Sequence, residues 1–187
     1  MGVMGAASRR DRRLPASRAA VLALLALGLG AAAVPATEPA HRAPVRIAVF
    51  EFELDDASPE AVLLGKTTNS AGMMAKVSSA ARQELEKSGR YSVIDASKAG
   101  AAAVAGTSLR NCDGCEARVA LRLGAEQSLI GVVRRATQTD YYIMIRIRDA
   151  RTGRILDEQE ANFAGGEEGW ASGVRMLIKH QILASPQ

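Results

Sequence analysis

Cys112 and Cys115 are the only cysteines of the chain, and their spacing is the pattern in it that best suits chemistry. Two cysteines separated by two residues can form a disulfide, exchange with other disulfides, or bind a metal ion. The residues after Cys115 read as a helix, and a helix N-terminus lowers the pKa of a thiol placed there. The pair therefore favours a structural disulfide in an exported protein, with thiol–disulfide exchange as the alternative.

Three further observations bear on these alternatives. The chain has no proline between residues 60 and 185, so the cis-proline that thioredoxin-like folds place beside such a pair is missing. A c-type haem needs a histidine directly after the second cysteine, where this chain has Glu116. Zinc needs more ligands than two thiols, and the two histidines, His41 and His180, are poorly placed to supply them. We therefore predict no metal site and no cofactor.

An acidic cluster at the end of the first predicted strand is a second candidate site. Glu51, Glu53 and Asp55 alternate along the chain and would share one face of a strand. Ligands of α/β sheets gather at the carboxyl ends of parallel strands, so a cation or a basic partner is one hypothesis. A solvated strand end is the interpretation we favour, because acidic residues are common in turns.

The aromatic residues give a third candidate. Tyr141 and Tyr142 are adjacent on a predicted strand, so one should be buried and the other exposed. Trp170 begins the last predicted helix, where packing across the sheet is the simplest role and an exposed indole would indicate a partner site. With two poorly placed histidines, no Ser–His–Asp set is credible, and the residues indicate no catalytic centre.

The elements that must position these residues follow from hydrophobic periodicity. Apolar spacings of three and four predict helices, and alternating or continuous apolar runs predict strands. Strands are expected at residues 45–54, 91–95, 128–133, 142–149 and 154–163, and helices at residues 73–87, 115–123 and from 167 onward. Residues 57–70 read as a polar loop. The order β-α-β-α-β-β-β-α predicts one α/β (α+β) domain over residues 45–187, with a mixed sheet of about five strands. Its first two strands should be parallel, and its last three an antiparallel meander.

The beginning of the chain reads as an export signal. Five arginines precede a run of Ala, Leu, Val and Gly that ends at small residues, and this pattern is typical of a signal peptide. We predict a signal peptide over residues 1–36, cleaved near Ala36, and a flexible lead-in over residues 37–44. With no cysteine near this point, we expect no lipid anchor and a soluble periplasmic product.

Charge argues against nucleic acid as a partner. The chain holds 24 Lys and Arg against 20 Asp and Glu. Without the five Arg and one Asp of residues 1–36, the remaining chain has 19 of each sign. A nucleic-acid-binding protein needs a basic face, and a net charge near zero gives no reason to expect one.

The order of elements resembles a known domain. The segments that carry the resemblance are Ile47–Phe52, Tyr91–Asp95, Leu123–Glu126 and the turn Arg151–Gly153. Together they look like the α/β domain shared by the amino-terminal part of TolB, by CsgG and by related envelope lipoproteins. These relatives imply scaffolding and protein contacts in the envelope. This chain lacks their lipid-anchor cysteine and has no propeller or pore segment, so secretion and Tol functions do not carry over.

A closer resemblance rests on fewer residues. Cys112-x-x-Cys115-Glu116, followed by Gly124-Ala125 and Trp170, is similar to an exported proteobacterial family of unknown function. That family implies no activity. We therefore begin with three hypotheses: a non-catalytic accessory module that binds an envelope protein, a thiol–disulfide redox protein, and a ligand or metal carrier that uses the acidic cluster.

Overall fold

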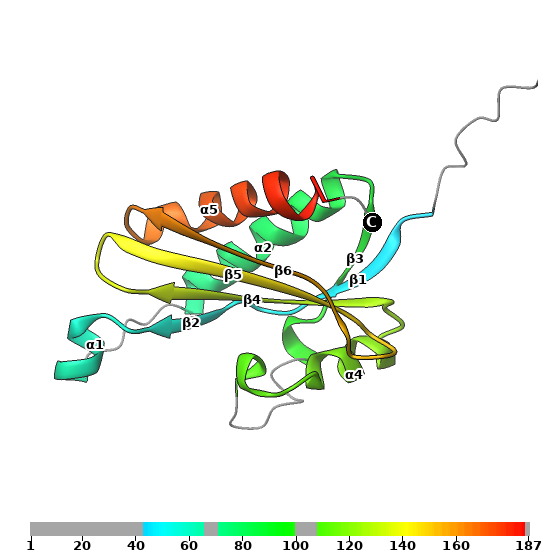
Figure 1. Cartoon of the computed structure of the whole chain (residues 1–187), viewed down its shortest axis with the longest axis horizontal. Coiled ribbons are helices and arrows are strands. Elements are labelled where there is room, and N and C mark those ends of the chain that lie inside the picture. The colour runs from blue at the N-terminus through cyan, green and yellow to red at the C-terminus, as the bar shows by residue number, and fades with distance from the viewer. Residues whose placement is uncertain (1–42, 66–70, 100–107, 186–187) are drawn as a thin grey trace, which may run out of the picture. The chain divides into compact units, whose positions relative to one another are not determined.

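The computed structural model describes residues 43–65, 71–99 and 108–185 (Figure 1). They form one mixed sheet with helices on both of its faces. The predicted signal peptide, residues 1–36, and residues 37–42 of the predicted lead-in lie outside the described residues. The predicted α/β fold class is confirmed.

The sheet has six described strands. They are β1 (Val45–Val49), β2 (Glu53–Asp56), β3 (Tyr91–Asp95), β4 (Gln127–Arg135), β5 (Asp140–Asp149) and β6 (Ile155–Ala164). The order is β3-β1-β4-β5-β6, and β2 follows β1 along the same edge of β4. β1 is parallel to β3 and β4, whereas β4, β5 and β6 are antiparallel neighbours. The predicted parallel pair and the predicted meander are both confirmed.

The helices divide between the two faces of the sheet (Figure 1). One face carries α2 (Ala71–Lys87) and α5 (Trp170–Leu177), which follows the short 3₁₀ turn η2 (Glu167–Gly169) and continues through the π-helical turn η3 (Ile178–Ile182). The other face carries η1 (Leu109–Asn111), a 3₁₀ turn, and α4 (Cys115–Arg122). α2 buries the apolar stripe that periodicity predicted, so its position follows from its own sequence.

The first predicted strand is divided in two. β1 ends at Val49 and β2 begins at Glu53, and between them Phe50 and Phe52 enter the cores on opposite faces of the sheet. A regular strand would send residues two apart to the same face. Gly131 of β4 makes the departure possible, because a Cβ there would lie 2.1 Å from the Phe52 ring. The N–H of Phe52 donates to Ser78 Oγ of α2 at 2.8 Å instead of to a neighbouring strand.

The segment expected to be a polar loop contains a short helix, α1 (Pro59–Leu64). Ser58 caps it by accepting a hydrogen bond from the N–H of Ala61, and Pro59 occupies the first turn, where its missing N–H costs nothing. Gly65 ends it with φ +62°. The three large apolar residues of this helix, Val62, Leu63 and Leu64, are exposed.

Two apolar cores lie on the two faces of the sheet. The core under α2 and α5 holds the large side chains, with Trp170, Leu85 and the isoleucines of β5 fully buried. The core under α4 and η1 is built from Phe50, Ile130 and several alanines. The second core is smaller, and it borders the cysteine pair.

Candidate functional site

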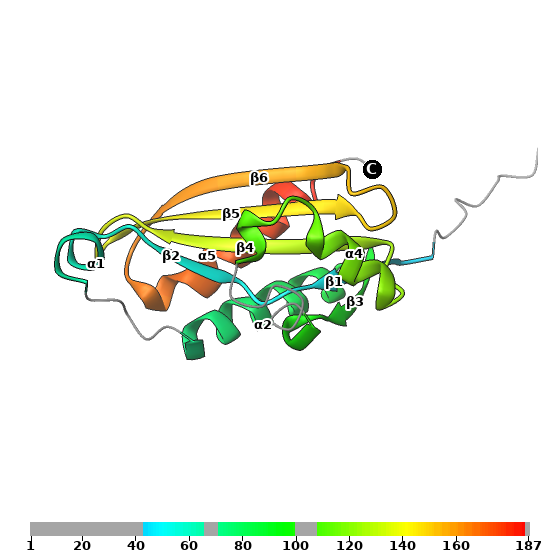
Figure 2. The same ribbon diagram turned by 90° about the horizontal axis from the view of Figure 1, so that it is seen from below.

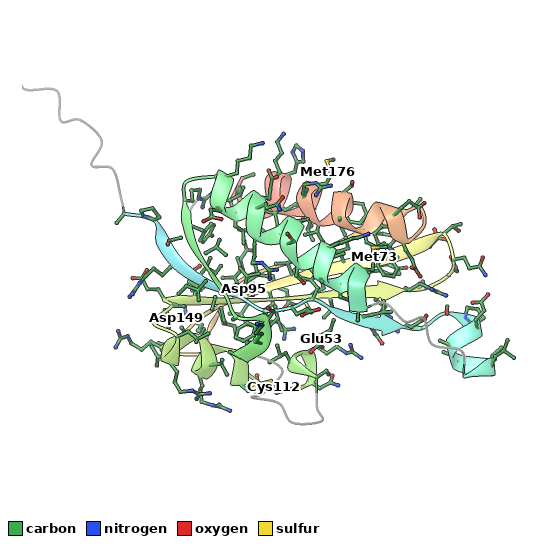
Figure 3. The ribbon with its side chains drawn as sticks, turned by 180° about the vertical axis from the view of Figure 1, so that it is seen from behind. Glu53, Met73, Asp95, Cys112, Asp149 and Met176 are labelled. Atoms are coloured by element: carbon green, nitrogen blue, oxygen red, sulfur yellow. A yellow bond between two sulfur atoms is a disulfide. The ribbon has the colours of Figure 1, made fainter. Side chains whose placement is uncertain are left out.

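The cysteine pair lies in the loop between η1 and α4. Cys112 follows η1, and Cys115 is the first residue of α4. The structure joins them by a disulfide with Cα atoms 5.7 Å apart. Gly114 turns the chain with φ +76°, a conformation that costs glycine little. In Figure 3, Cys112 lies on the α4 side of the sheet together with Glu53, whereas Met73 and Met176 lie on the opposite, α2 and α5 side.

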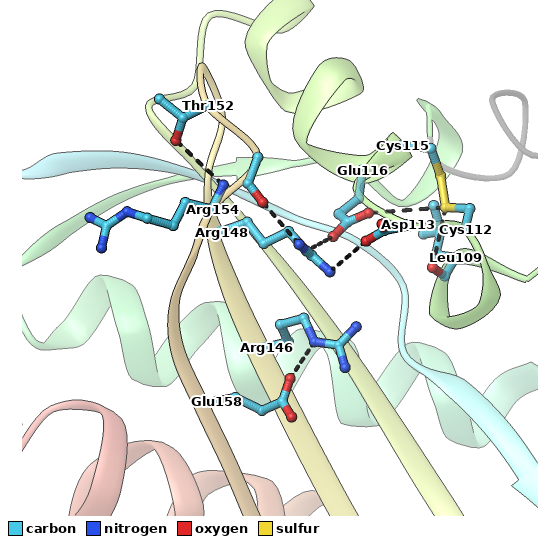
Figure 4. A network of polar contacts seen from close by, with 11 residues as sticks. Leu109, Cys112, Asp113, Cys115, Glu116, Arg146, Arg148, Thr152, Arg154 and Glu158 are labelled. Carbon is cyan, nitrogen blue, oxygen red and sulfur yellow. Dashed lines mark hydrogen bonds and ion pairs between the residues drawn. A yellow bond between two sulfur atoms is a disulfide. The ribbon is translucent and has the colours of Figure 1, made fainter.

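Directly after the disulfide, Glu116 forms a buried ion pair with Arg148 of β5 (Figure 4). Glu116 is 1% exposed, and its Oε1 lies 2.9 Å from Arg148 Nε. Arg148 also donates to the carbonyl oxygen of Gly153 at 2.9 Å and pairs with Asp113 at 3.3 Å. One guanidinium therefore joins the start of α4, the cysteine loop and the turn between β5 and β6.

Sequence reasoning quoted Glu116 in the motif but missed Arg148. The signal that could have revealed it is weak. Arg146 and Arg148 alternate with isoleucines along β5, so both are expected on the face away from the larger core. Nothing local indicates that one of them is buried against a carboxylate 32 residues earlier in the chain.

The predicted acidic cluster is partly assembled. Glu53 accepts hydrogen bonds from the backbone N–H groups of Leu109 and Arg110. The guanidinium of Arg110 lies 3.6 Å from Glu53 and 3.6 Å from Asp55, and Arg134 lies 3.7 Å from Asp55. Glu51 lies in the break between β1 and β2. The carboxylates of Glu53 and Asp55 are thus engaged by arginines of the same chain, and they hold η1 against β2.

On the α4 side of the sheet, no helix of the described residues lies across the halves of β5 and β6 that are farther from α4 (Figure 2). The register places Met144 between Val132 of β4 and Glu160 of β6, and places Arg146 opposite Glu158. A hollow of about 370 Å³ lies here. We call this surface the open face; it is lined by Asp55, Arg110, Asn111, Val132, Arg134, Tyr142, Met144, Arg146, Glu158 and Glu160.

Trp170 lies away from the open face, in the larger core. Its side chain is 1% exposed, and its ring centroid lies 6.1 Å from that of Tyr141. Tyr141 in turn stacks on Phe163 at 5.6 Å. Burial, together with the negative charge of Glu168, raises the pKa of the Tyr141 hydroxyl. Trp170 therefore packs across the sheet. One of the two adjacent tyrosines is buried and the other exposed, as predicted, and the exposed one is Tyr142, at 36%.

A sequence model of a protein family matches residues 45–182, which include every described strand and helix. The chain belongs to the DUF3280 family. Its description is "Protein of unknown function (DUF2380)". The expected membership of a family of unknown function is confirmed. No curated protein matches the chain.

Several solved structures are similar to the chain. The PelC dodecamer from Paraburkholderia phytofirmans matches with a TM-score of 0.49 and 16% identity, covering 80% of this chain and 94% of that one. Lipoprotein GNA1162 from Neisseria meningitidis matches with a TM-score of 0.46 and 18% identity, covering 77% and 100%. TolB from Acinetobacter baumannii matches with a TM-score of 0.45 and 14% identity, covering 77% and 29%.

No helix of the described residues is long and apolar enough to cross a bilayer.

Proposed function

We propose that this DUF3280 protein is a non-catalytic binding module of the periplasm that holds an envelope protein on its open face. The observation that carries the proposal is the row of Tyr142, Met144 and Arg146 along β5, of which Tyr142 is exposed and the other two are half-buried. No helix of the described residues lies across this row. Most of the opposite face of the same strand is buried under α5. The open face is therefore a sheet surface that the rest of the described chain leaves accessible to a partner.

The chemistry of the open face suits a protein partner. Tyrosine, methionine and arginine are enriched at protein interfaces and supply large contact areas. Arg110 and Arg134 pair with Asp55, and Arg146 pairs with Glu158, so the surface carries both signs of charge. A mixed surface of this kind favours polar, charge-paired contacts and disfavours a phosphate backbone, which requires a basic face.

The periplasmic part of the proposal rests on the sequence. Residues 1–36 have the pattern of a signal peptide, and a disulfide persists in oxidising compartments. The non-catalytic part of the proposal rests on the carboxylates of the two candidate sites, which are already paired with arginines. Glu116 and Arg148 are paired with each other, and Glu53 and Asp55 are paired with Arg110. The same pairing argues against the acidic cluster as a carrier site for a ligand or metal.

A pair of photo-crosslinking variants tests the proposal in the periplasm of the native host. A photo-crosslinking amino acid replaces Met144 on the open face in one variant, and Met176 of α5, on the opposite face and 53% exposed, in the control. We expect one discrete adduct at position 144 and none at 176. After the partner is identified, Met144→Lys should weaken binding of the purified partner at least about tenfold, as expected for a central interface residue. Equal adducts at both positions, or binding unaffected by Met144→Lys, would contradict the proposal.

Thiol–disulfide exchange is the second candidate function. The observation that favours it is that both cysteines are only partly buried, with Cys115 at the start of α4. The test is the reduction potential of the pair, measured by equilibration with glutathione. A potential below about −300 mV marks a structural disulfide, and a clearly higher one would support exchange.

A further inference from the structure

We propose that Cys112 and Cys115, once reduced, form with Glu116 a site for one divalent cation of the zinc class. The two sulfur atoms and a carboxylate oxygen of Glu116 lie within 4.8 Å of one another. These are the ligand atoms that zinc takes in proteins. The proposal is independent of the open face, because none of the three residues lines that surface.

The carboxylate of Glu116 provides the second observation. Its Oε1 lies against Arg148 Nε, and its Oε2 lies 4.0 Å from Cys112 Sγ. A disulfide sulfur carries no proton, so this contact is not a hydrogen bond, and within the described residues no other donor is placed on Oε2. A buried carboxylate oxygen without a donor is costly. A cation between Oε2 and the sulfur atoms would satisfy this oxygen.

Loading of the site begins with reduction. A dithiol reductant gives two electrons and two protons to the Cys112–Cys115 bond, which becomes two thiols while the reductant becomes a disulfide. The cation then displaces both thiol protons to solvent. Two thiolates and the Glu116 carboxylate carry three negative charges, and the divalent cation with Arg148 carries three positive charges. These charges therefore balance, as a half-buried position requires, and the further charge beside Arg148, that of Asp113, lies on a side chain that is 98% exposed to solvent.

The arrangement selects a class of ion. Two thiolates with one carboxylate suit a borderline ion such as Zn²⁺, whereas Ca²⁺ and Mg²⁺ prefer oxygen ligands throughout. Cu(I) selects soft sulfur ligands and would gain little from Glu116. Arg148 would hold the ligating carboxylate in place from the outer shell, a role that often tunes metal affinity. Sequence reasoning missed this set because it looked for histidines and did not count Glu116 as a ligand.

The test uses the purified protein with Co²⁺ as the probe and Zn²⁺ as the competitor. The protein is reduced with a phosphine, freed of reductant without oxygen, and titrated while the thiolate-to-cobalt charge-transfer band is recorded. We expect one Co²⁺ per chain in the reduced protein, displaced by Zn²⁺, and no such band in the oxidised protein. Equal binding by the oxidised protein, or one ion per two chains, would overturn the proposal.

Two matched substitutions test the carboxylate ligand. Glu116→Gln should weaken binding at least roughly 10- to 100-fold, the range found when even an outer-shell partner is lost. Glu86→Gln removes the same charge from an exposed side chain of α2, on the opposite face of the sheet, and should leave the affinity unchanged. If Glu116→Gln does not fold, the double variant Glu116→Gln with Arg148→Gln removes both charges of the pair together. Unchanged affinity in whichever variant folds would overturn the role of Glu116.

Discussion

The two faces of the sheet are held by different means. Under α2 and α5, large apolar side chains such as Trp170, Ile143 and Ile145 fill the space between helices and strands. Under α4, the apolar core is small and rich in alanine, and it borders a disulfide and the buried pair of Glu116 and Arg148. The first face is stabilised by the burial of apolar side chains, whereas the second depends on a few specific polar contacts.

This difference indicates where the molecule can act. The packing of α2 and α5 covers most of the first face of the sheet. On the second face, the described helices cover only part of the sheet, and the open face lies beside them. Both of our functional proposals, the open face and the metal site, therefore fall on the side whose packing is polar.

The largest effect is expected in the apolar face. Trp170→Ala should lower the free energy of unfolding by about 3–5 kcal/mol, because a buried indole is replaced by a cavity. The measurement is urea unfolding followed by circular dichroism. The matched control is Met176→Ala on the exposed side of α5, expected to lie within about 0.5 kcal/mol of the wild type. Similar losses in both variants would mean that the first face is not held by its core.

Next in size is the buried ion pair of the second face. Arg148→Met leaves the Glu116 carboxylate buried without its partner and should cost about 3 kcal/mol of unfolding free energy. The double variant Arg148→Met with Glu116→Leu should recover most of that loss, since an apolar pair can replace a buried ionic one. Arg146→Met, which breaks the outer pair with Glu158, is the control and should cost no more than about 1 kcal/mol.

The disulfide should matter less for stability than the ion pair beside it. It closes a loop of only three residues' separation, so replacing Cys112 and Cys115 together by serine should cost about 2 kcal/mol or less. Thermal unfolding of the double variant and of the phosphine-reduced wild type gives two independent values of this cost. A loss of unfolding free energy larger than that of Arg148→Met would show that the disulfide, and not the ion pair, contributes more to the stability of the second face.

The smallest effect is expected at the turn between β5 and β6. Hydrogen bonds from the backbone N–H and the hydroxyl of Thr152 hold the pKa of Asp149 below its ordinary value of 3.8. The resulting stabilisation is complete above that value and is lost as the pH falls through the lower pKa of the folded protein. Asp149→Asn should therefore be less stable than the wild type at neutral pH, and the difference should vanish in acid. Urea unfolding across this pH range measures it, and a difference that persists at low pH would assign it to the turn geometry instead.

Much of the fold could be predicted because the sequence of most elements shows which of their faces is buried. α2 spaces its apolar residues by three and four, and β5 alternates isoleucines with polar residues, so each pattern states both the element and its orientation. The break between β1 and β2 could not be predicted in this way. It depends on Gly131 across the sheet and on Ser78 of α2, neither of which is adjacent in the sequence.

The candidate site was predictable only in its local part. The spacing of Cys112 and Cys115 identifies the pair, and alternation brings Glu53 and Asp55 to one face. The buried partner of Glu116 comes from β5 and is specified by tertiary packing alone. α1 was missed for another reason: Ser58 and Pro59 form a helix-start signal, and the exposed apolar residues behind it carry no periodicity that would have supported a helix.

The break between β1 and β2 has a consequence for how the domain unfolds. Because Phe50 anchors one core and Phe52 the other, three consecutive residues hold both layers at once. Neither layer can unfold without disturbing the backbone of residues 50–52, which also anchors the other layer. The described domain should therefore lose both faces in a single cooperative transition, even though one face is packed by large apolar groups and the other by a few polar contacts.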